Sequence, residues 1–329
     1  MADWNIATGD AETDKLLSKD IIIEAPEDIF WNAYMGKGAN NVIQVDMRLG
    51  KAKGDQVTIF QARKLSSAGT SGSGTLEGAE ETPNTNDDAV VIDQIRHGVK
   101  LGGKLDEQRA IYDMRMTAKE LLKIWLAENI DSQIFTDILS SPTRVLYQGT
   151  ATSTGTLAST DLFDTNLLTK ASTLAGKLAP KILPIKHRGM NVFVAVMGPD
   201  SIYDMKIESA VWTQMQQLAR NRGPDNPMFT GSLGMSDRVL INSHNLVSTT
   251  TNWGAGSNLN GINNIFCGRQ AGYFAWARLP FFVTKEFDYG DKLGFAVGSM
   301  HGHTKVVFDS EDSAVIMLRA TRTNVAEQS

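Results

Sequence analysis

Residues able to support catalysis or metal binding are sparse in this chain. His301 and His303 form the only close histidine pair, and Asp309 follows six residues later. Two imidazoles and a carboxylate can bind zinc, but this spacing lacks the pattern of a zinc site, so we expect a surface turn. The single cysteine, Cys267, lies in an apolar run beside Phe266 and is expected to be a buried, unreactive thiol.

Other signatures of enzyme chemistry are also missing from the sequence. The glycines of residues 69–74 follow no strand of a nucleotide-binding unit and precede no helix that could hold a phosphate. Residues 231–234, Gly-Ser-Leu-Gly, are one residue short of the nucleophile-elbow pattern. No pair of acidic residues stands out as a general acid and base. The sequence therefore predicts no catalytic residues, no cofactor and no metal site.

Two groups of charged residues remain as candidates for a functional surface. The basic group recurs at i, i+4 and i+8 of an expected helix, where like charges disfavour the helix by about 0.2–0.5 kcal/mol per pair. The acidic group has almost no basic partner nearby in the sequence. We expect either two solvated charged surfaces or a salt-sensitive contact between them in neighbouring subunits. The acidic group is Glu77, Glu80, Glu81, Asp87 and Asp88, and the basic group is Arg115, Lys119 and Lys123.

The acidic group belongs to an expected β-hairpin with a very long polar tip. Its legs, residues 56–62 and 89–96, are rich in the β-branched residues that favour strands. The Ser, Thr and Gly run of residues 66–75 and the acidic run of residues 77–88 contain too few apolar side chains to form a core. Because an isolated two-stranded hairpin is marginally stable in water, we expect a neighbouring subunit to stabilise this one.

The basic group lies on an expected long helix. It is predicted to begin near Asp106, a good N-cap residue, and to run to about Leu139 without proline or glycine, a length of roughly 50 Å. Two apolar rows that converge at Trp125 predict an amphipathic helix packed along most of its length. The rows are Ile111, Met114, Ala118, Leu121 and Trp125, and Leu122, Leu126, Ile130, Ile134 and Ile138.

The rest of the chain indicates an α+β protein. Residues 1–50 are expected to form an arm that docks through large side chains around Phe30 and Trp31, and the Ser, Thr and Gly-rich residues 141–165 are expected to form a connector. Helices are predicted at 164–179 and from Pro199 to about residue 222. Strands are predicted at 191–197, 239–241, 264–266, 281–283, 295–297, 305–308 and 314–320.

Composition excludes several classes of protein. The formal net charge of -5 and the pI near 5.6 argue against a dedicated nucleic-acid binder. A lone cysteine cannot form an internal disulfide, and no Asn-x-Ser/Thr sequence occurs. There is no run of about eighteen apolar residues, and acidic residues occupy the N-terminus where a signal peptide would be basic. We therefore expect cytosolic synthesis and no membrane segment.

Short pieces of the sequence, taken in order, resemble the major capsid proteins of tailed bacteriophages, in particular the branch typified by the coat protein of coliphage N-four. The resemblance covers about residues 35–320 and rests on order and spacing, since no single piece is specific. The pieces are residues 54–58, 76–81, 92–97, 107–109, 113–115, 130–135, 229–235, 288–290 and 305–308.

The resemblance implies the Hong Kong 97-like capsid fold. It places an N-terminal arm at 1–50, an extended loop at 51–103, a peripheral domain with the long spine helix at 104–160 and 285–329, and an axial domain at 161–284. In this fold the extended loop lies over the peripheral domain of the adjacent subunit. The helix expected at 106–139 would be the spine helix.

The same resemblance implies a structural function. Copies would form pentamers and hexamers that close into an icosahedral shell around double-stranded DNA, without sequence-specific DNA binding. Scaffolding, portal and decoration proteins would be further partners, and assembly would take place in the cytoplasm of the host bacterium. The mild negative charge suits a shell lining that does not adhere to DNA.

Two alternatives belong to other classes. An encapsulin-like nanocompartment shell shares the fold and differs in enclosing an enzyme rather than a genome. A soluble enzyme with an acidic, glycine-rich lid would need catalytic groups facing that lid, and the sequence offers none.

Overall fold

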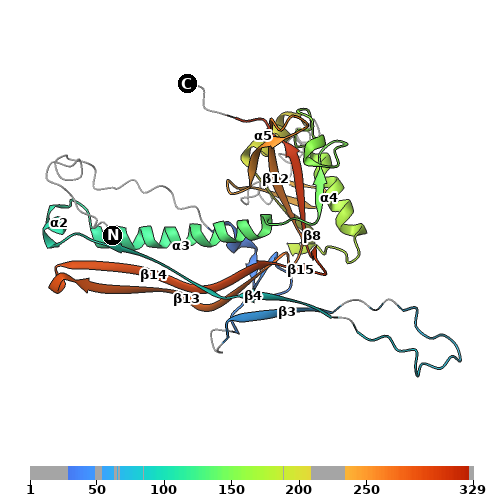
Figure 1. Cartoon of the computed structure of the whole chain (residues 1–329), viewed down its shortest axis with the longest axis horizontal. Coiled ribbons are helices and arrows are strands. Elements are labelled where there is room, and N and C mark those ends of the chain that lie inside the picture. Colours follow the sequence, from blue (N-terminus) through green and yellow to red (C-terminus); the bar gives the residue numbers. More distant parts are fainter. Residues whose placement is uncertain are drawn as a thin grey trace.

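The computed structural model describes residues 29–325, apart from 49–53, 63–64, 66, 84, 188 and 209–233. It is an α+β protein with an elongated part, built on the long helix α3 and the β13–β14 hairpin, and a compact part at one end of that helix (Figure 1). The β3–β4 hairpin projects from the same end of the molecule as the compact part, on the other side of the elongated sheet.

The elongated part contains a five-stranded sheet covered by α3 (Figure 1). Its two longest strands, β13 and β14, form an antiparallel hairpin, and β5 pairs with the outer edge of β14. Residues from α3 and from this sheet, such as Leu122, Ile43 and Val297, share one apolar core. The strand order is β1 (Met35–Gly36), β2 (Ile43–Asp46), β13 (Gly272–Phe287), β14 (Lys292–Lys305) and β5 (Asp93–Lys100).

The expected helix from Asp106 is in fact two helices, α2 (Lys104–Arg109) and α3 (Met114–Leu139). The chain is extended at Ala110. Asp113 caps α3, because its side chain accepts hydrogen bonds from the backbone N–H groups of residues 115 and 116. The predicted end at Leu139 is correct. With 26 residues, α3 is about 39 Å long rather than 50 Å.

The apolar pattern of α3 is confirmed in one row and only partly in the other. Every member of the row from Leu122 to Ile138 is buried. In the other row Met114 and Ala118 are buried and Trp125 is partly buried, whereas Ile111 and Leu121 are exposed. The buried face therefore follows the row that begins at Met114 and continues through Leu122.

The compact part is built on a second sheet. Its central strand β8 (Met190–Met197) is buried over its last six residues, as its continuous apolar run predicts. Helix α4 (Thr165–Lys177) lies within the predicted range 164–179, and the side chain of Asp164 caps its start. Helix α5 is Pro199–Glu208, and the remainder of the helix expected to residue 222 lies outside the described residues. The other strands are β6 (Val145–Tyr147), β7 (Ile185–His187), β9 (Gly234–Ser236), β10 (Val239–Ser243), β11 (Thr249–Trp253), β12 (Leu259–Cys267) and β17 (Val315–Thr321).

The hairpin has the predicted ascending leg but a different descending leg. Strand β3 (Gln56–Ala62) pairs in antiparallel register with β4 (Thr85–Val91). The run expected as one strand over 89–96 is divided at Ile92, because β5 turns away to pair with β14. We use "extended loop" below for β3, β4 and the residues between them.

The first described residues dock as expected, by large aromatic side chains. The short 3-10 helix Phe30–Tyr34 buries Trp31 completely, with the Trp31 and Phe135 ring centroids 5.1 Å apart. The backbone N–H of Phe30 donates to Asp131 Oδ2 over 2.7 Å. This segment is therefore fixed to α3 of its own chain.

The expected division into four regions stays a prediction, although sheet membership differs from it at three strands. Strands β6 and β17, expected in the peripheral domain, lie in the sheet of the compact part, and most of β13, expected in the axial domain, lies in the elongated sheet. Among the described helices, none is long and apolar enough to cross a membrane. Two short strands, β15 (Val307–Phe308) and β16 (Glu311–Asp312), pair with each other.

Candidate intersubunit contact surface

The base of the extended loop is held by its own chain. Val57 and Val90 pack with Tyr273, Ala275 and Val306 in a small apolar cluster. The backbone N–H of residue 92 also donates to the carbonyl of residue 55 over 2.8 Å. The expectation that a neighbouring subunit must stabilise the hairpin is thus wrong for its base, which rests on β13.

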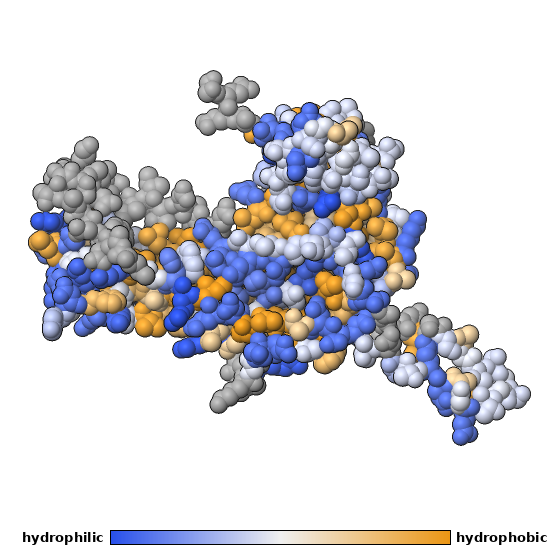
Figure 2. All heavy atoms as spheres, in the orientation of Figure 1, coloured by the Kyte–Doolittle hydropathy of each residue, from blue (hydrophilic) through white to orange (hydrophobic). Residues whose placement is uncertain are grey.

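The tip of the extended loop is different, because it adds almost nothing to the core. Every residue in 67–83 is exposed except Glu81, which is half-buried. Glu81 Oε2 accepts a hydrogen bond from the Ser67 backbone N–H over 2.7 Å and so joins the two sides of the tip. Figure 2 shows this tip standing clear of the rest of the molecule, with a largely hydrophilic surface.

The five acidic residues of the loop have unequal roles. Asp88 Oδ2 accepts from the Val307 backbone N–H over 3.1 Å, so this carboxylate helps to anchor the base of the loop. Glu80 Oε2 accepts from the Gly78 backbone N–H over 2.7 Å. Glu77 and Asp87 are exposed. The three carboxylates best placed to meet a partner are therefore those of Glu77, Glu80 and Asp87.

The three basic residues share an exposed face of α3, as predicted. Arg115 makes two hydrogen bonds of 2.8 Å to the carboxylate of Glu107 in α2, which lowers the pKa of Glu107 and raises that of Arg115. Lys119 Nζ lies 5.2 Å from the centroid of the Phe295 ring. The carboxylate that relieves the like charges here is therefore that of Glu107 in the preceding helix.

The acidic and basic groups do not meet within one chain. The extended loop projects at one end of the molecule, whereas the N-terminal half of α3 lies toward the other end (Figure 1). Any contact between the two groups must therefore join different copies of the chain.

The histidine pair lies in a strand, contrary to the expected surface turn. Both residues belong to β14, where His301 is 2% exposed and its ring stacks on Phe274 at a centroid distance of 5.2 Å. Nε2 of each histidine lies 3.1 Å from Gln133 Oε1 on α3. The side chains at 295, 297, 299 and 301 are all buried, because alternate residues of a strand face the same side of the sheet. The two-residue spacing of His301 from this row was the feature that could have predicted its burial.

The described part of the chain contains little that resembles a catalytic or metal centre. No cluster of three or more His, Cys, Asp or Glu side chains there could hold a metal ion. Cys267 is fully buried, and this burial raises the pKa of its thiol. As the sequence predicts, Cys267 is an inaccessible thiol.

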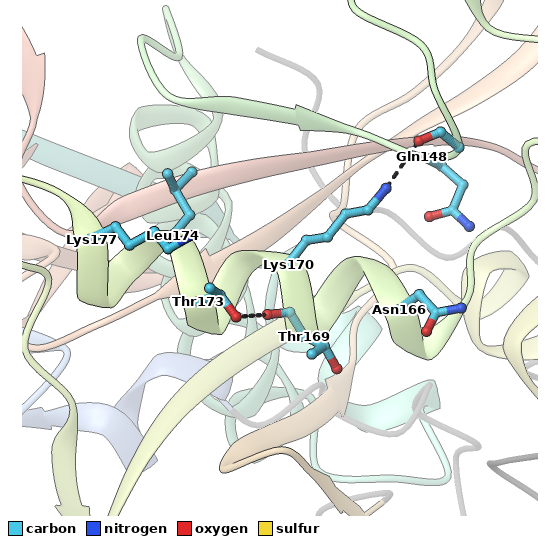
Figure 3. Close-up of a pocket in the computed structure, with 8 residues that line it drawn as sticks. Gln148, Asn166, Thr169, Lys170, Thr173, Leu174 and Lys177 are labelled. Atoms are coloured by element: carbon cyan, nitrogen blue, oxygen red, sulfur yellow. Dashed lines mark hydrogen bonds between the residues drawn. The ribbon is translucent and has the colours of Figure 1, made fainter.

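One open groove of about 610 Å³ lies beside α4. Figure 3 shows Lys170 reaching across it from α4, and its Nζ donates to the Gly149 carbonyl over 2.9 Å. Lys177 and the hydroxyls of Thr169 and Thr173 line the same groove, and each hydroxyl donates to a backbone carbonyl four residues earlier. The groove holds no acid–base pair or nucleophile arrangement.

Comparisons with known proteins cover nearly the whole chain. A family described as "Phage capsid protein" matches residues 5–141 and 137–320. The major capsid protein of Pseudomonas phage KPP25 is 26% identical over 330 residues, which cover 85% of this chain and 86% of that protein.

Solved capsid structures share the fold. The capsid protein of Ralstonia phage GP4 superposes with a TM-score of 0.85 at 26% identity and covers 99% of this chain and 100% of its own. The cyanophage Pam1 capsid subunit gives a TM-score of 0.83 at 19% identity, with 99% of this chain and 100% of that chain covered.

Proposed function

The chain belongs to the phage capsid protein family, and we propose that its copies associate into pentamers and hexamers through the extended loop. It is a major capsid protein of a tailed phage, with the Hong Kong 97-type fold, and forms the icosahedral capsid of the virion. The capsid fold and the function of a major capsid protein, both implied by the sequence resemblance, are thus confirmed. The matched phage capsids favour this function over a nanocompartment shell or an enzyme with a lid.

The exposed surface of the extended loop supports this mode of association most directly. The tip is exposed, and apolar side chains on both strands are also left in solvent, with Phe60 on β3 74% exposed and Val91 on β4 66% exposed. Covering an apolar side chain of this size stabilises a contact by about 1.5–3 kcal/mol. A neighbouring copy's elongated part, which contains α3, would cover the loop in the shell.

Charged side chains would set the alignment of the two copies in this contact. Glu77, Glu80 and Asp87 are exposed on the loop, and Lys119 and Lys123 are exposed on α3. Exposed pairs contribute about 0–1 kcal/mol each and are screened by salt, so they would direct the docking more than strengthen it. Arg115 would contribute less, because Glu107 already neutralises it.

The finer assignments form part of the same proposal. The shell would enclose double-stranded DNA without sequence-specific contacts, and scaffolding, portal and decoration proteins would bind it during or after assembly in the cytoplasm of the host bacterium. The four expected regions would keep their roles, with the extended loop reduced to residues 56–91 and the compact part acting as the axial domain.

Replacing residues 67–83 by Asn-Gly tests the proposal. The shortened chain keeps Val57 and Val90, so it should fold and melt within a few degrees of the wild type, while shell formation should fail. Circular dichroism and sedimentation velocity measure the two properties. Wild-type shell yields from the shortened chain would refute the loop's role, and loss of folding would place the tip in the subunit core.

A further inference from the structure

We propose that the buried ion pair between Lys305 and Asp312 fixes the orientation of the compact part relative to the elongated part, and that this orientation decides whether shells of a single size form. The inference rests on the proposed assembly into a shell and names two residues that control its geometry. Both side chains are buried in their own subunit, so the pair acts within one copy of the chain.

The pair lies where the chain crosses between the two parts. Lys305 is the last residue of β14 in the elongated part, and Asp312 belongs to β16, shortly before β17 of the compact part. Figure 1 shows β15, the partner of β16, where the two parts meet. The crossings at residues 268–271 and 306–314 are joined by backbone hydrogen bonds, of 2.8 Å from the N–H of residue 268 to the carbonyl of residue 314 and of 3.1 Å from the N–H of residue 306 to the carbonyl of residue 271.

Lys305 also holds the crossing that leads from α3 to β6. Its Nζ donates to the carbonyl of Ser140 over 2.6 Å and to that of Ser141 over 3.3 Å, and these are the two residues that follow α3. A cation beside the last carbonyls of a helix is stabilised by those groups and by the helix dipole. Lys305 thus ties the end of β14 to the end of the long helix.

Asp312 holds the same crossing from the side of the compact part. Its Oδ1 lies 2.6 Å from Lys305 Nζ, and its Oδ2 accepts from the Thr143 backbone N–H over 2.9 Å. The Asp312 backbone N–H donates to Thr143 Oγ1 over 2.7 Å. The two charged residues therefore connect the ends of α3 and β14 to the segment that enters the compact part.

The burial of the pair points to a role in geometry rather than in stability. Lys305 is 5% exposed and Asp312 is 0% exposed. The loss of hydration of two buried charges offsets most of their attraction, so an uncharged pair of similar size is often equally stable. An ion pair with fixed hydrogen-bond partners nevertheless permits only one arrangement of its surroundings, because any rotation leaves a buried charge unpaired.

A single orientation matters because a closed shell repeats the same subunit. Rings close only when each copy is rotated against the next by the correct angle, and another angle gives open or irregular assemblies. A compact part that could rotate against the elongated part would alter the shape that each copy contributes. The pair therefore makes the size of the shell uniform.

Neutralising the pair separates stability from geometry. Lys305→Met and Asp312→Asn each leave one buried charge without its partner, so each alone should lower the melting temperature by about 5 °C or more. Combining them removes both charges, and the new amide oxygen can still accept from Thr143, so at least half of that loss should be recovered. Cryo-electron microscopy of the double variant should show several shell sizes, with fewer than half of the particles at the wild-type size.

The matched control is Glu311→Gln. Glu311 precedes Asp312 and pairs with Arg144 over 3.0 Å, but its side chain is 62% exposed. Because the exposed pair is hydrated, this variant should change neither the melting temperature nor the shell size.

A second measurement uses the free subunit and does not depend on assembly. Spin labels on Glu128→Cys in α3 and Lys206→Cys in α5 report the distance between the two parts, since both positions are exposed and Cys267 is fully buried. Double electron–electron resonance should give a distance distribution about twice as wide or more when both charges of the pair are removed.

Three results would overturn the inference: a distribution of wild-type width in the double variant, uniform shells of wild-type size from it, or a double variant less stable than either single one. A wild-type chain that forms no shells would contradict the proposed function instead, and the distances in the free subunit would still decide the role of the pair.

Discussion

Nδ1 of His303 lies 2.5 Å from Oδ2 of Asp137, and this contact joins β14 to the last turns of the spine helix. Gln133, one turn earlier on α3, reaches both His303 and the buried His301. A short polar ladder thus fixes the C-terminal half of α3 to the sheet beneath it. This ladder adds polar contacts to the apolar core that α3 and the sheet share.

Removing the charge of Asp137 should weaken this junction. Asp137→Asn keeps the shape of the side chain but loses a charge-assisted hydrogen bond, so we expect the free energy of unfolding to fall by about 1–2 kcal/mol at pH 7. Urea denaturation followed by circular dichroism measures it. Glu128→Gln, which removes a charge from an exposed position of the same helix, is the control and should have little effect. Equal stability of both variants would contradict the role given to Asp137.

Acid should destabilise the subunit through His301. Burial, followed by the nearby His303, lowers the pKa of His301 to about 4, with Asp93 opposing the shift. An unfolded histidine titrates near 6.5, so the unfolded chain binds the extra proton first, and stability should fall as the pH drops from about 6.5 to 4. The loss is on the order of 3 kcal/mol. His301→Gln should flatten this part of the pH profile, and an unchanged profile would contradict the assignment.

Two substitutions to alanine can test which face of the spine helix is buried. Leu122 is 1% exposed, so Leu122→Ala should cost about 2–5 kcal/mol. Trp125 is only partly buried, and its ring packs at a tilt against that of His97 at a centroid distance of 4.6 Å. Trp125→Ala should therefore cost less than Leu122→Ala, about 1–3 kcal/mol. Thermal unfolding of both variants decides the order. A larger loss for the tryptophan variant would mean that its ring belongs to the core.

The proposed charge contact predicts rescue by double reversal. Changing Glu77, Glu80 and Asp87 to Lys should reduce shell yield at low salt, and adding Lys119→Glu and Lys123→Glu in the same chain should restore part of it. Glu81, Asp88 and Arg115 are left unchanged, because each bonds to a residue at least eight positions away in its own subunit, whereas Glu80 bonds to the backbone only two positions away. Normal assembly of the acidic reversal at low salt, or no recovery in the double reversal, would contradict the charge contact.

Local pattern predicted those elements whose ends carry a chemical signal. Asp164 and Leu139 marked the start of α4 and the end of α3 correctly, and the continuous apolar run of β8 marked a buried strand. The start of α3 was missed because both Asp106 and Asp113 are good caps and nothing between them breaks a helix. That the long helix begins after Asp113 rather than near Asp106 is seen only in the folded structure.

Partners in space were harder to predict than elements. The run from Ala89 to Arg96 is uniformly strand-like, but Ile92 is where it passes from one sheet to another, and no local residue signals the change. Likewise, Glu107 reaches Arg115 only because the chain bends between α2 and α3. The acidic and basic groups were found from spacing alone, whereas their docking depends on a second copy of the chain.

A cryo-electron microscopy reconstruction of self-assembled shells tests most directly whether the extended loop of one copy docks on the elongated part of its neighbour. We predict rings of five and six subunits in which residues 67–83 lie against the neighbour's elongated part, near Lys119 and Lys123. Shells in which this loop contacts only its own subunit, or projects into solvent, would contradict it.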